Sequence, residues 1–314
     1  MILLHAFSNP SAYRGGIVAI GNFDGVHRGH QSMIEVLVRR AKTEQAPTVV
    51  LTFDPHPITL LRPGHAPASL STLPWKAQLL GECGVDCVIA YPTDEALMNL
   101  TPPQFFDRIV QDKLNARGLV EGPNFFFGRD RAGDISTLRS LCKAAGVSLD
   151  VVPAVRFDDR LVSSSAVRSA IADGRIAAAV GLLGHPFRVR GRVVRGSGRG
   201  ADIGFPTANL ENVETLMPAD GVYAGRAYDS GRSYPAAINV GSNPTFNDPT
   251  RKLEVHLVGF TGELYGQPLD VDFLSRLRET LRFESVTELQ LQVERDVEQA
   301  RALAEKTEPN GPDL

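Results

Sequence analysis

The chain has 314 residues, which exceeds the roughly 100–200 residues of a typical domain, so we expect two domains. Hydrophobic residues make up 43% and charged residues 22%, as in folded globular proteins and unlike disordered or fibrous ones. The formal net charge of -3 excludes a globally basic surface for nucleic acid or anionic membranes. Any phosphate-binding site must therefore be local.

The start of the chain, MILLHAFSNPSAYRGG, lacks a basic region followed by an apolar core, and no stretch approaches the ~20 apolar residues of a membrane span. These features predict a soluble, cytoplasmic protein. Cys83, Cys87 and Cys142 are few and scattered, and the first two lack the further ligands that a zinc site needs. We expect reduced, mostly buried thiols.

Short β-branched runs alternate with helical patterns through the first part of the chain. The expected strands are residues 17–21, 48–53, 85–91 and 149–154, and the expected helices are 30–45, 104–115 and 138–146. This alternation predicts an α/β domain with a parallel sheet covered by helices on both faces. Ligands of such sheets bind at the carboxyl ends of the strands.

After Gly184 the chain changes to short extended runs separated by glycine and proline. Residues 187–194, 221–228, 234–241, 252–260 and 269–277 are the expected strands of a small antiparallel β-barrel. Residues 284–306 are expected to form an amphipathic helix packed on the barrel, with Val286, Leu289, Leu291, Val293 and Val297 as its apolar positions. The sequence therefore predicts two domains, 1–184 and 185–314.

The first candidate site follows the strand at residues 17–20. Gly21, Gly25 and Gly29 allow the backbone to approach a polyphosphate, and the helix that begins near Gly29 offers unpaired N–H groups to an anion. His27 and His30 are three residues apart, so both can face one anion. They could instead only satisfy the loop, or bind zinc, although no third zinc ligand is evident.

The segment GNFDGVHRGH resembles the G-x-F-D-G-x-H-x-G-H signature of the FAD synthetase branch of the HxGH nucleotidyltransferases. Residues 52–57 resemble the T-F-x-P-H-P loop of that family, and residues 122–128 resemble its flavin-side segment, which implies a flavin contact for Asn124. Residues 162–168 resemble a family motif whose hydroxyls and arginine bind ATP phosphates. The resemblance implies an ATP site formed by Gly21, Phe23, Asp24, Gly25, His27, His30, Ser164, Ser165 and Arg168.

Two features near these motifs leave alternatives open. Ser165 stands where the family usually has threonine, which keeps the hydroxyl group. Without its neighbours, the segment 162–168 would be read as a helix cap with a solvated arginine. Arg129 and Arg131, after Gly128, are expected to border the flavin phosphate.

The second candidate site lies between strands of the barrel. A loop with Gly196, Gly198 and Gly200 can surround phosphate with backbone N–H groups, but its spacing is not that of a P-loop. Thr207 and Asn209 follow and offer oxygen ligands suited to Mg²⁺. Phosphorylation of an alcohol needs a group that accepts the hydroxyl proton, a role typical of a carboxylate. Glu254 is the candidate, although strand periodicity alone favours a solvated outer-face residue.

The segments GFPTAN, GVYAGRA, INVGSNPTF, LEVHLVGFTGELYG and FLSRLRETLRFES resemble, in that order, those of riboflavin kinase domains. The resemblance implies that Gly196, Gly198, Arg199, Gly200, Thr207 and Asn209 bind ATP, with Thr207 and Asn209 on Mg²⁺. It also implies that Glu254 is the base and that Arg278 lies near the flavin, with a surface role as the alternative for Arg278. Ala201 stands where the family usually has a basic or polar residue, and Asn243 stands where it commonly has arginine.

The resemblance covers roughly residues 15–300 and identifies the chain as a member of the bifunctional prokaryotic riboflavin kinase/FAD synthetase family. It implies a Rossmann-like HxGH domain and a riboflavin kinase barrel that use ATP and Mg²⁺ to convert riboflavin to FMN and FMN to FAD. No nucleic-acid or membrane partner is expected, and self-association is left open. Two alternatives are a nucleotidyltransferase for another alcohol phosphate, such as phosphopantetheine, or with a CTP-derived donor, and a non-catalytic flavin-binding protein.

Overall fold

The computed structural model describes residues 1–61, 64, 66–243 and 248–307, and the chain forms two compact units. The first comprises Met1–Pro67 and Thr72–Val162, and the second comprises Ala68–Ser71 and Ser163–Leu314. The domain boundary at residues 184/185 stays a prediction, because a compact unit does not define where an activity begins.

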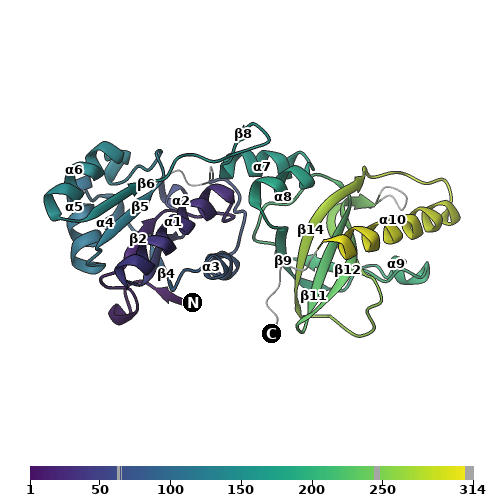
Figure 1. The fold of residues 1–314 in the computed structure, drawn as a ribbon. Helices are drawn as coiled ribbons and strands as arrows, with labels where there is room; N and C mark the ends of the chain where they lie inside the picture. The colour runs from purple at the N-terminus through teal and green to yellow at the C-terminus, as the bar shows by residue number, and fades with distance from the viewer. Residues whose placement is uncertain (62–63, 65, 244–247, 308–314) are drawn as a thin grey trace. The chain divides into compact units, whose positions relative to one another are not determined.

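The first unit is built on a parallel sheet of six strands in the order β1-β4-β3-β2-β5-β6 (Figure 1). The strands are β1 (Ile2–His5), β2 (Ile17–Ile20), β3 (Thr48–Asp54), β4 (Cys87–Pro92), β5 (Gly118–Glu121) and β6 (Ser148–Val151). The chain runs from β2 to β3 on one side and later returns to β5 on the other side of β2. The crevice between β2 and β5 is thus the point where the strand order reverses, which is where such sheets bind ligands.

Helices cover both faces of this sheet (Figure 1). They are α1 (Arg28–Glu44), α2 (Ile58–Leu61), α3 (Leu73–Glu82), α4 (Glu95–Met98), α5 (Pro102–Phe105), the π-helix Phe106–Lys113 and α6 (Ile135–Ala145), with 3-10 turns at Pro10–Ala12 and Arg129–Arg131 and a hairpin of β7 (Arg156–Phe157) and β8 (Arg160–Leu161). Successive strand residues face opposite sides, so Val18 packs with α5 and α6 residues, whereas Ala19 packs with α1 and α3 residues. The predicted two-sided parallel sheet is confirmed.

One predicted helix differs in detail. Residues 104–115 were expected as one helix, but α5 begins at Pro102 and passes at Phe106 into a π-helix, whose hydrogen bonds span five residues rather than four. Thr101 and Gln104 form a reciprocal capping box at its start. Hydrophobic periodicity locates a helix here but does not distinguish these hydrogen-bond patterns.

The second unit contains a closed antiparallel barrel in the order β10-β13-β12-β11-β14-β9. Its strands are β9 (Phe187–Val194), β10 (Ala208–Glu211), β11 (Gly221–Asp229), β12 (Arg232–Asn243), β13 (Asp248–Leu257) and β14 (Pro268–Arg278). The short helix α9 (Arg199–Asp202) lies between β9 and β10, and α7 (Ser164–Ala172) and α8 (Ile176–Leu183) precede the barrel. The predicted barrel is confirmed, and β10 completes it by pairing with both β9 and β13.

The final helix, α10 (Val286–Lys306), packs against β11, β12 and β14 (Figure 1). The predicted apolar face is partly wrong, because Val286 and Leu291 are 53% and 50% exposed. The buried positions of the helix are Asp296, Val297, Ala300 and Ala304. The small alanines let the helix approach the barrel closely, and Asp296 is buried because it pairs with Arg278 of the barrel.

The three cysteines are free thiols, with Cys87 and Cys142 buried and Cys83 half-buried, as predicted. Burial raises the pKa of Cys87 and of Cys142 to about 11. Within the described ranges, no helix is both long and apolar enough to cross a bilayer.

Candidate active sites

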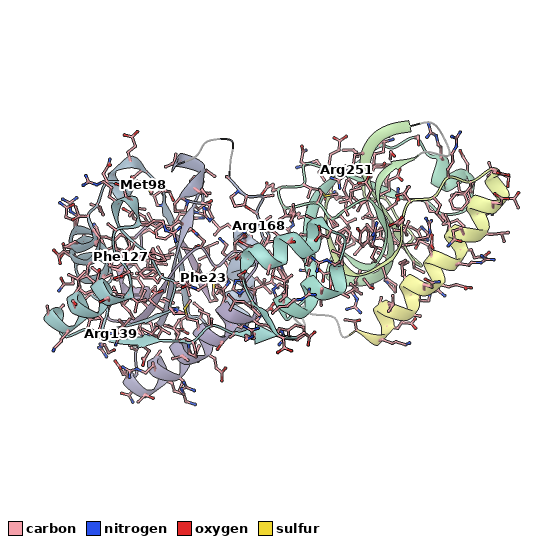
Figure 2. All side chains as sticks on the ribbon, turned by 90° about the horizontal axis from the view of Figure 1, so that it is seen from above. Phe23, Met98, Phe127, Arg139, Arg168 and Arg251 are labelled. Atoms are coloured by element: carbon pink, nitrogen blue, oxygen red, sulfur yellow. The ribbon has the colours of Figure 1, made fainter. Side chains whose placement is uncertain are left out.

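The turn between β2 and α1 has an unusual backbone. Phe23 and Val26 have φ angles of 47° and 38°, and Gly25 has 75°. The left-handed region is unfavourable for a bulky or β-branched residue and costs about 1–3 kcal/mol per residue, a cost that functional turns commonly carry. Phe23 and Val26 are both buried, so the core holds the turn in this conformation. Figure 2 labels Phe23 in the first unit.

The two predicted histidines lie against each other at the start of α1. Their rings stack with centroids 3.6 Å apart at 13°, and His27 Nδ1 accepts the His30 backbone N–H at 3.3 Å, so His27 is the N-cap of the helix. A Cβ atom at Gly29 would lie 3.2 Å from the His27 ring, which explains the glycine. Both rings line one cavity of about 250 Å³ beside the β2–β5 crevice.

The surroundings of His30 in this cavity favour its neutral form. Burial lowers its pKa well below 6.5, and the neighbouring His27 and Lys76 lower it further. Its Nδ1 atom is buried and has no hydrogen-bond partner in the described part of the chain. A neutral imidazole with an unpaired nitrogen can hydrogen-bond a ligand, and an anionic ligand would favour its protonated form.

Lys76 was missed by the sequence reasoning. It is 8% exposed on α3, its Nζ lies 3.5 Å from Thr52 Oγ1, and Thr52 in turn donates to the Asn22 carbonyl at 3.1 Å. Burial lowers the pKa of Lys76, and Asp24 and Asp54 oppose that effect. The lysine thus joins the GNFDG turn to the T-F-x-P-H-P segment. A single lysine within the apolar run LPWKAQLL was the signal in the sequence.

The flavin-side segment reaches the same cavity. Asn124 and Phe125 line it together with the two histidines, so the structure brings Asn124 and the HxGH motif to one site. The Phe125 and Phe127 rings stack at 5.5 Å, and Arg131 lies 4.8 Å above the exposed Phe126 ring. Arg131 therefore has an aromatic partner, and its predicted place near a flavin phosphate stays a prediction.

Ser164, Ser165 and Arg168 lie on α7, which belongs to the second unit. Ser163 caps this helix by accepting the Ala166 N–H at 3.2 Å, and Arg168, labelled in Figure 2, donates to the Ala68 carbonyl at 2.8 Å. The arginine is thus held by backbone of its own unit. Its contribution to the ATP site of the first unit stays a prediction.

In the second unit, the glycine-rich loop packs directly on the predicted ligands. A Cβ atom at Gly196 would lie 2.2 Å from Asn209 Nδ2, and one at Gly200 would lie 2.5 Å from the Phe205 carbonyl oxygen and 3.3 Å from Thr207 Oγ1. Any side chain at these glycines would displace the threonine or the asparagine. The glycine-rich loop lines one cavity of about 220 Å³ together with Thr207 and Asn209.

Glu254 lies at the centre of a polar row on this cavity. The strand registers pair it with Asn209 of β10 on one side and with Asn239 of β12 on the other. Asn239 Nδ2 donates to Glu254 Oε2 at 3.3 Å, and all three residues line the cavity. Glu254 does lie on the outer face of the barrel, opposite the buried Leu253 and Val255, but it is half-buried rather than solvated because the glycine-rich loop borders this face. Asn239 was missed, since only strand pairing brings it beside Glu254.

The rest of the cavity is largely apolar and is bounded by residues from the barrel, from the segment between β14 and α10, and from α10 itself. Arg278 lines it but is tied to Asp296, with Nη2–Oδ2 at 2.8 Å and side-chain exposures of 18% and 5%. The surface alternative for Arg278 is therefore wrong. The apolar lining residues are Val222, Ala237, Ile238, Leu281, Phe283, Leu289 and Val293. Such walls suit a flat ring system, with polar groups at one end.

The Mg²⁺ expected in the second unit is tested by the chemistry of the donors. The hydroxyl oxygen of Thr207 and the amide oxygen of Asn209 are hard oxygen ligands, which fit Mg²⁺. The described residues contain no cluster of three or more His, Cys, Asp or Glu that could hold a metal. Ala201 also lines this cavity. The side chain of Asn243 is not among the side chains that the structure describes.

The two cavities lie beside a glycine-rich turn on a parallel sheet and beside a glycine-rich loop on a barrel, an arrangement typical of an enzyme that acts on nucleotides. The family model for FAD synthetase matches residues 9–166, and that for riboflavin kinase matches residues 183–304. The chain belongs to the bifunctional riboflavin kinase/FMN adenylyltransferase family. The two activities of that family make FMN and FAD.

Relatives with this description cover nearly the whole chain. The one from Pseudomonas fluorescens is 40% identical over 293 residues, covering 93% of this chain and 94% of its own. The one from Escherichia coli K12 is 37% identical over 296 residues, covering 94% and 95%. A crystal structure from Streptococcus pneumoniae, described as a macrolide-efflux protein, has a TM-score of 0.85 at 32% identity, covering 96% of this chain and 99% of its own.

Proposed function

We propose that the cavity of the first unit joins the phosphate of FMN to the AMP part of ATP, with release of pyrophosphate. We further propose that the cavity of the second unit transfers the γ-phosphoryl group of ATP to riboflavin. The presence of both site architectures in one chain favours this pair over a nucleotidyltransferase for another alcohol phosphate, which has no need of the barrel. Since both reactions consume ATP, a cytoplasmic location fits them.

In the first unit, the stacked histidines and the start of α1 support binding of the ATP phosphates. Attack of the FMN phosphate on the α-phosphorus builds negative charge on the non-bridging oxygens and on the departing pyrophosphate. The first backbone N–H groups of α1 and the unpaired His30 Nδ1 supply donors or a proton site for that charge. Asn124 lies on the same cavity and suits a contact with the flavin nucleotide.

In the second unit, the row of Asn209, Glu254 and Asn239 carries the proposal. Glu254 accepts the proton of the riboflavin hydroxyl group while the oxygen of that hydroxyl bonds to the γ-phosphorus of ATP. The bond between the γ-phosphorus and the bridging oxygen then breaks, and ADP leaves with that oxygen. Thr207 and Asn209 would hold Mg²⁺, which when bound offsets the phosphate charge. Asn239 orients Glu254 by its hydrogen bond, and the glycine-rich loop offers backbone N–H groups to the phosphates.

The test is a pair of site variants assayed by chromatography of flavins after incubation with ATP and Mg²⁺. Glu254→Gln is expected to abolish formation of FMN from riboflavin and to leave conversion of supplied FMN to FAD unchanged. His27→Ala combined with His30→Ala is expected to do the opposite. Loss of both activities in either variant, with its fold intact, would contradict the two-site assignment. A wild-type protein that changes neither flavin would support the non-catalytic alternative.

A further inference from the structure

We propose that Glu121 is a specificity-determining residue of the cavity in the first unit, where its carboxyl group hydrogen-bonds the polar edge of a nitrogen heteroaromatic ring. Two substrates of the proposed reaction carry such a ring, namely the adenine of ATP and the isoalloxazine of FMN. The inference rests on the proposed function of this cavity and adds a contact to the ring rather than to the phosphates.

Glu121 occupies the point where the sheet opens. The parallel ladder between β2 and β5 pairs Ile17 with Gly118 and Val18 with Leu119, and it ends there. Two residues further on, Glu121 Oε1 accepts the Ile20 N–H at 2.8 Å, so a side chain replaces the next ladder bond. The carboxyl group therefore lies in the crevice between β2 and β5, directly before the phosphate-binding turn.

The Glu121 carboxyl group is buried and makes few polar contacts. Glu121 is 1% exposed, and within the described chain the one hydrogen-bond partner of its carboxyl group is the Ile20 N–H. Burial raises the pKa of Glu121 well above its usual 4.5, and the Ile20 hydrogen bond opposes that rise. The protonated acid is thus favoured, which has one acceptor oxygen engaged with Ile20 and one O–H group available as a donor.

The surroundings of Glu121 select a ring rather than a phosphate. Glu121 lines the same cavity as His27, His30 and Asn124, and the walls near it are apolar, with Ile20, Phe125, Val152, Pro153 and Val162 among them. A carboxyl group does not attract a phosphate anion, and apolar walls favour a flat ring. Adenine and isoalloxazine both present adjacent donor and acceptor atoms at one edge, which match a carboxylic acid.

The decisive variants are Glu121→Gln and Glu121→Leu. Glutamine keeps a carbonyl oxygen for the Ile20 N–H and an N–H donor for the ring, whereas leucine has a similar size and removes both. Glu35→Leu, at an exposed position on α1, is the matched control for the same replacement outside the cavity. Circular dichroism and calorimetry of each variant report whether the first unit, which contains residue 121, is folded.

The measurement is KM and kcat for FAD formation with ATP and then FMN varied, and with inosine triphosphate in place of ATP. Glu121→Gln is expected to stay within about 3-fold of wild type. Glu121→Leu is expected to raise one KM about 10-fold, which corresponds to about 1.4 kcal/mol and to the net value of one hydrogen bond. A rise in the KM for ATP with loss of the preference for ATP over inosine triphosphate assigns the ring as adenine. A rise in the KM for FMN with that preference intact assigns it as isoalloxazine.

The proposal is overturned if Glu121→Leu lowers kcat or the melting temperature while both KM values stay unchanged, since Glu121 would then only tie β5 to β2. Equal loss in Glu121→Gln and Glu121→Leu would overturn it as well. Calorimetric binding of ATP and of FMN to the same variants repeats the comparison without turnover. A wild-type protein that binds both ligands but forms no FAD would therefore contradict the proposed function while still testing Glu121.

Discussion

Two neighbouring ion pairs on the barrel differ mainly in burial and allow a direct test of its energetic effect. Strands β9 and β14 pair Arg188 with Asp272 and, two residues further along, Arg190 with Asp270, both in bidentate geometry. The inner pair has side-chain exposures of 9% and 2%, whereas the outer pair has 51% and 19%. Tyr228 also donates to Asp272 at 2.8 Å, and burial together with Asp272 raises the pKa of Tyr228 to about 12.

Asp272→Ala is expected to destabilise the protein far more than Asp270→Ala. The first change leaves the Arg188 guanidinium buried without its counter-ion, which typically costs about 3–5 kcal/mol. The second removes a largely exposed pair, worth about 0–1 kcal/mol. At about 2–4 °C per kcal/mol, calorimetry should show the melting transition of the second unit falling by roughly 6–20 °C in Asp272→Ala and by less than about 4 °C in Asp270→Ala.

Removing both charges of the inner pair should recover most of that loss. Arg188→Met combined with Asp272→Leu leaves no uncompensated charge, and apolar replacement of a buried pair is often neutral or stabilising. Equal destabilisation by Asp272→Ala and Asp270→Ala would refute the claim that burial sets the energy. A double variant no more stable than Asp272→Ala would refute the claim that the unpaired arginine is the cause.

Three further outcomes are expected. Gly196→Ala should lower the kcat/KM of riboflavin kinase about 100-fold, because the added methyl group would meet Asn209 and displace it by about 1 Å. Formation of FAD from FMN should stay unchanged. Asn239→Ala should lower the kinase kcat about 10-fold with little change in the KM for riboflavin, as the hydrogen bond to Glu254 is lost, and an unchanged kcat would contradict its orienting role. The pKa of Cys87 and of Cys142 is about 11, so only about 0.1% of each thiol is thiolate at pH 8, and iodoacetamide should not label them in the folded protein at that pH. Labelling should increase as the pH rises towards 11 or when the protein unfolds, and rapid labelling at pH 8 would contradict their burial.

The sequence alone was sufficient for the fold class of each unit and for the chemistry offered by the motifs, although strands β1 and β5 were not predicted. Alternating β-branched and helical patterns located the parallel sheet, and short runs between glycines and prolines located the barrel. His27, His30 and Asn124 were predicted for one site, as were Thr207, Asn209 and Glu254 for the other, and the structure brings each set to one cavity. Local patterns succeed where the residues of a motif are close in the chain, as His27 and His30 are at the start of α1 and Thr207 and Asn209 are at the start of β10.

The tertiary structure alone decided what covers each face and which distant residues meet. Periodicity places Glu254 opposite the buried Leu253 and Val255, but whether that face meets solvent or a cavity depends on a loop about fifty residues earlier. Asn239 and Glu121 become functional candidates only through strand pairing, and Lys76 only through the packing of α3. On α10, Asp296 is buried while Leu291 is exposed, because the partner Arg278 lies on another element. A residue's own neighbours in the chain do not specify such partners, since hydrogen bonds and burial depend on proximity in space.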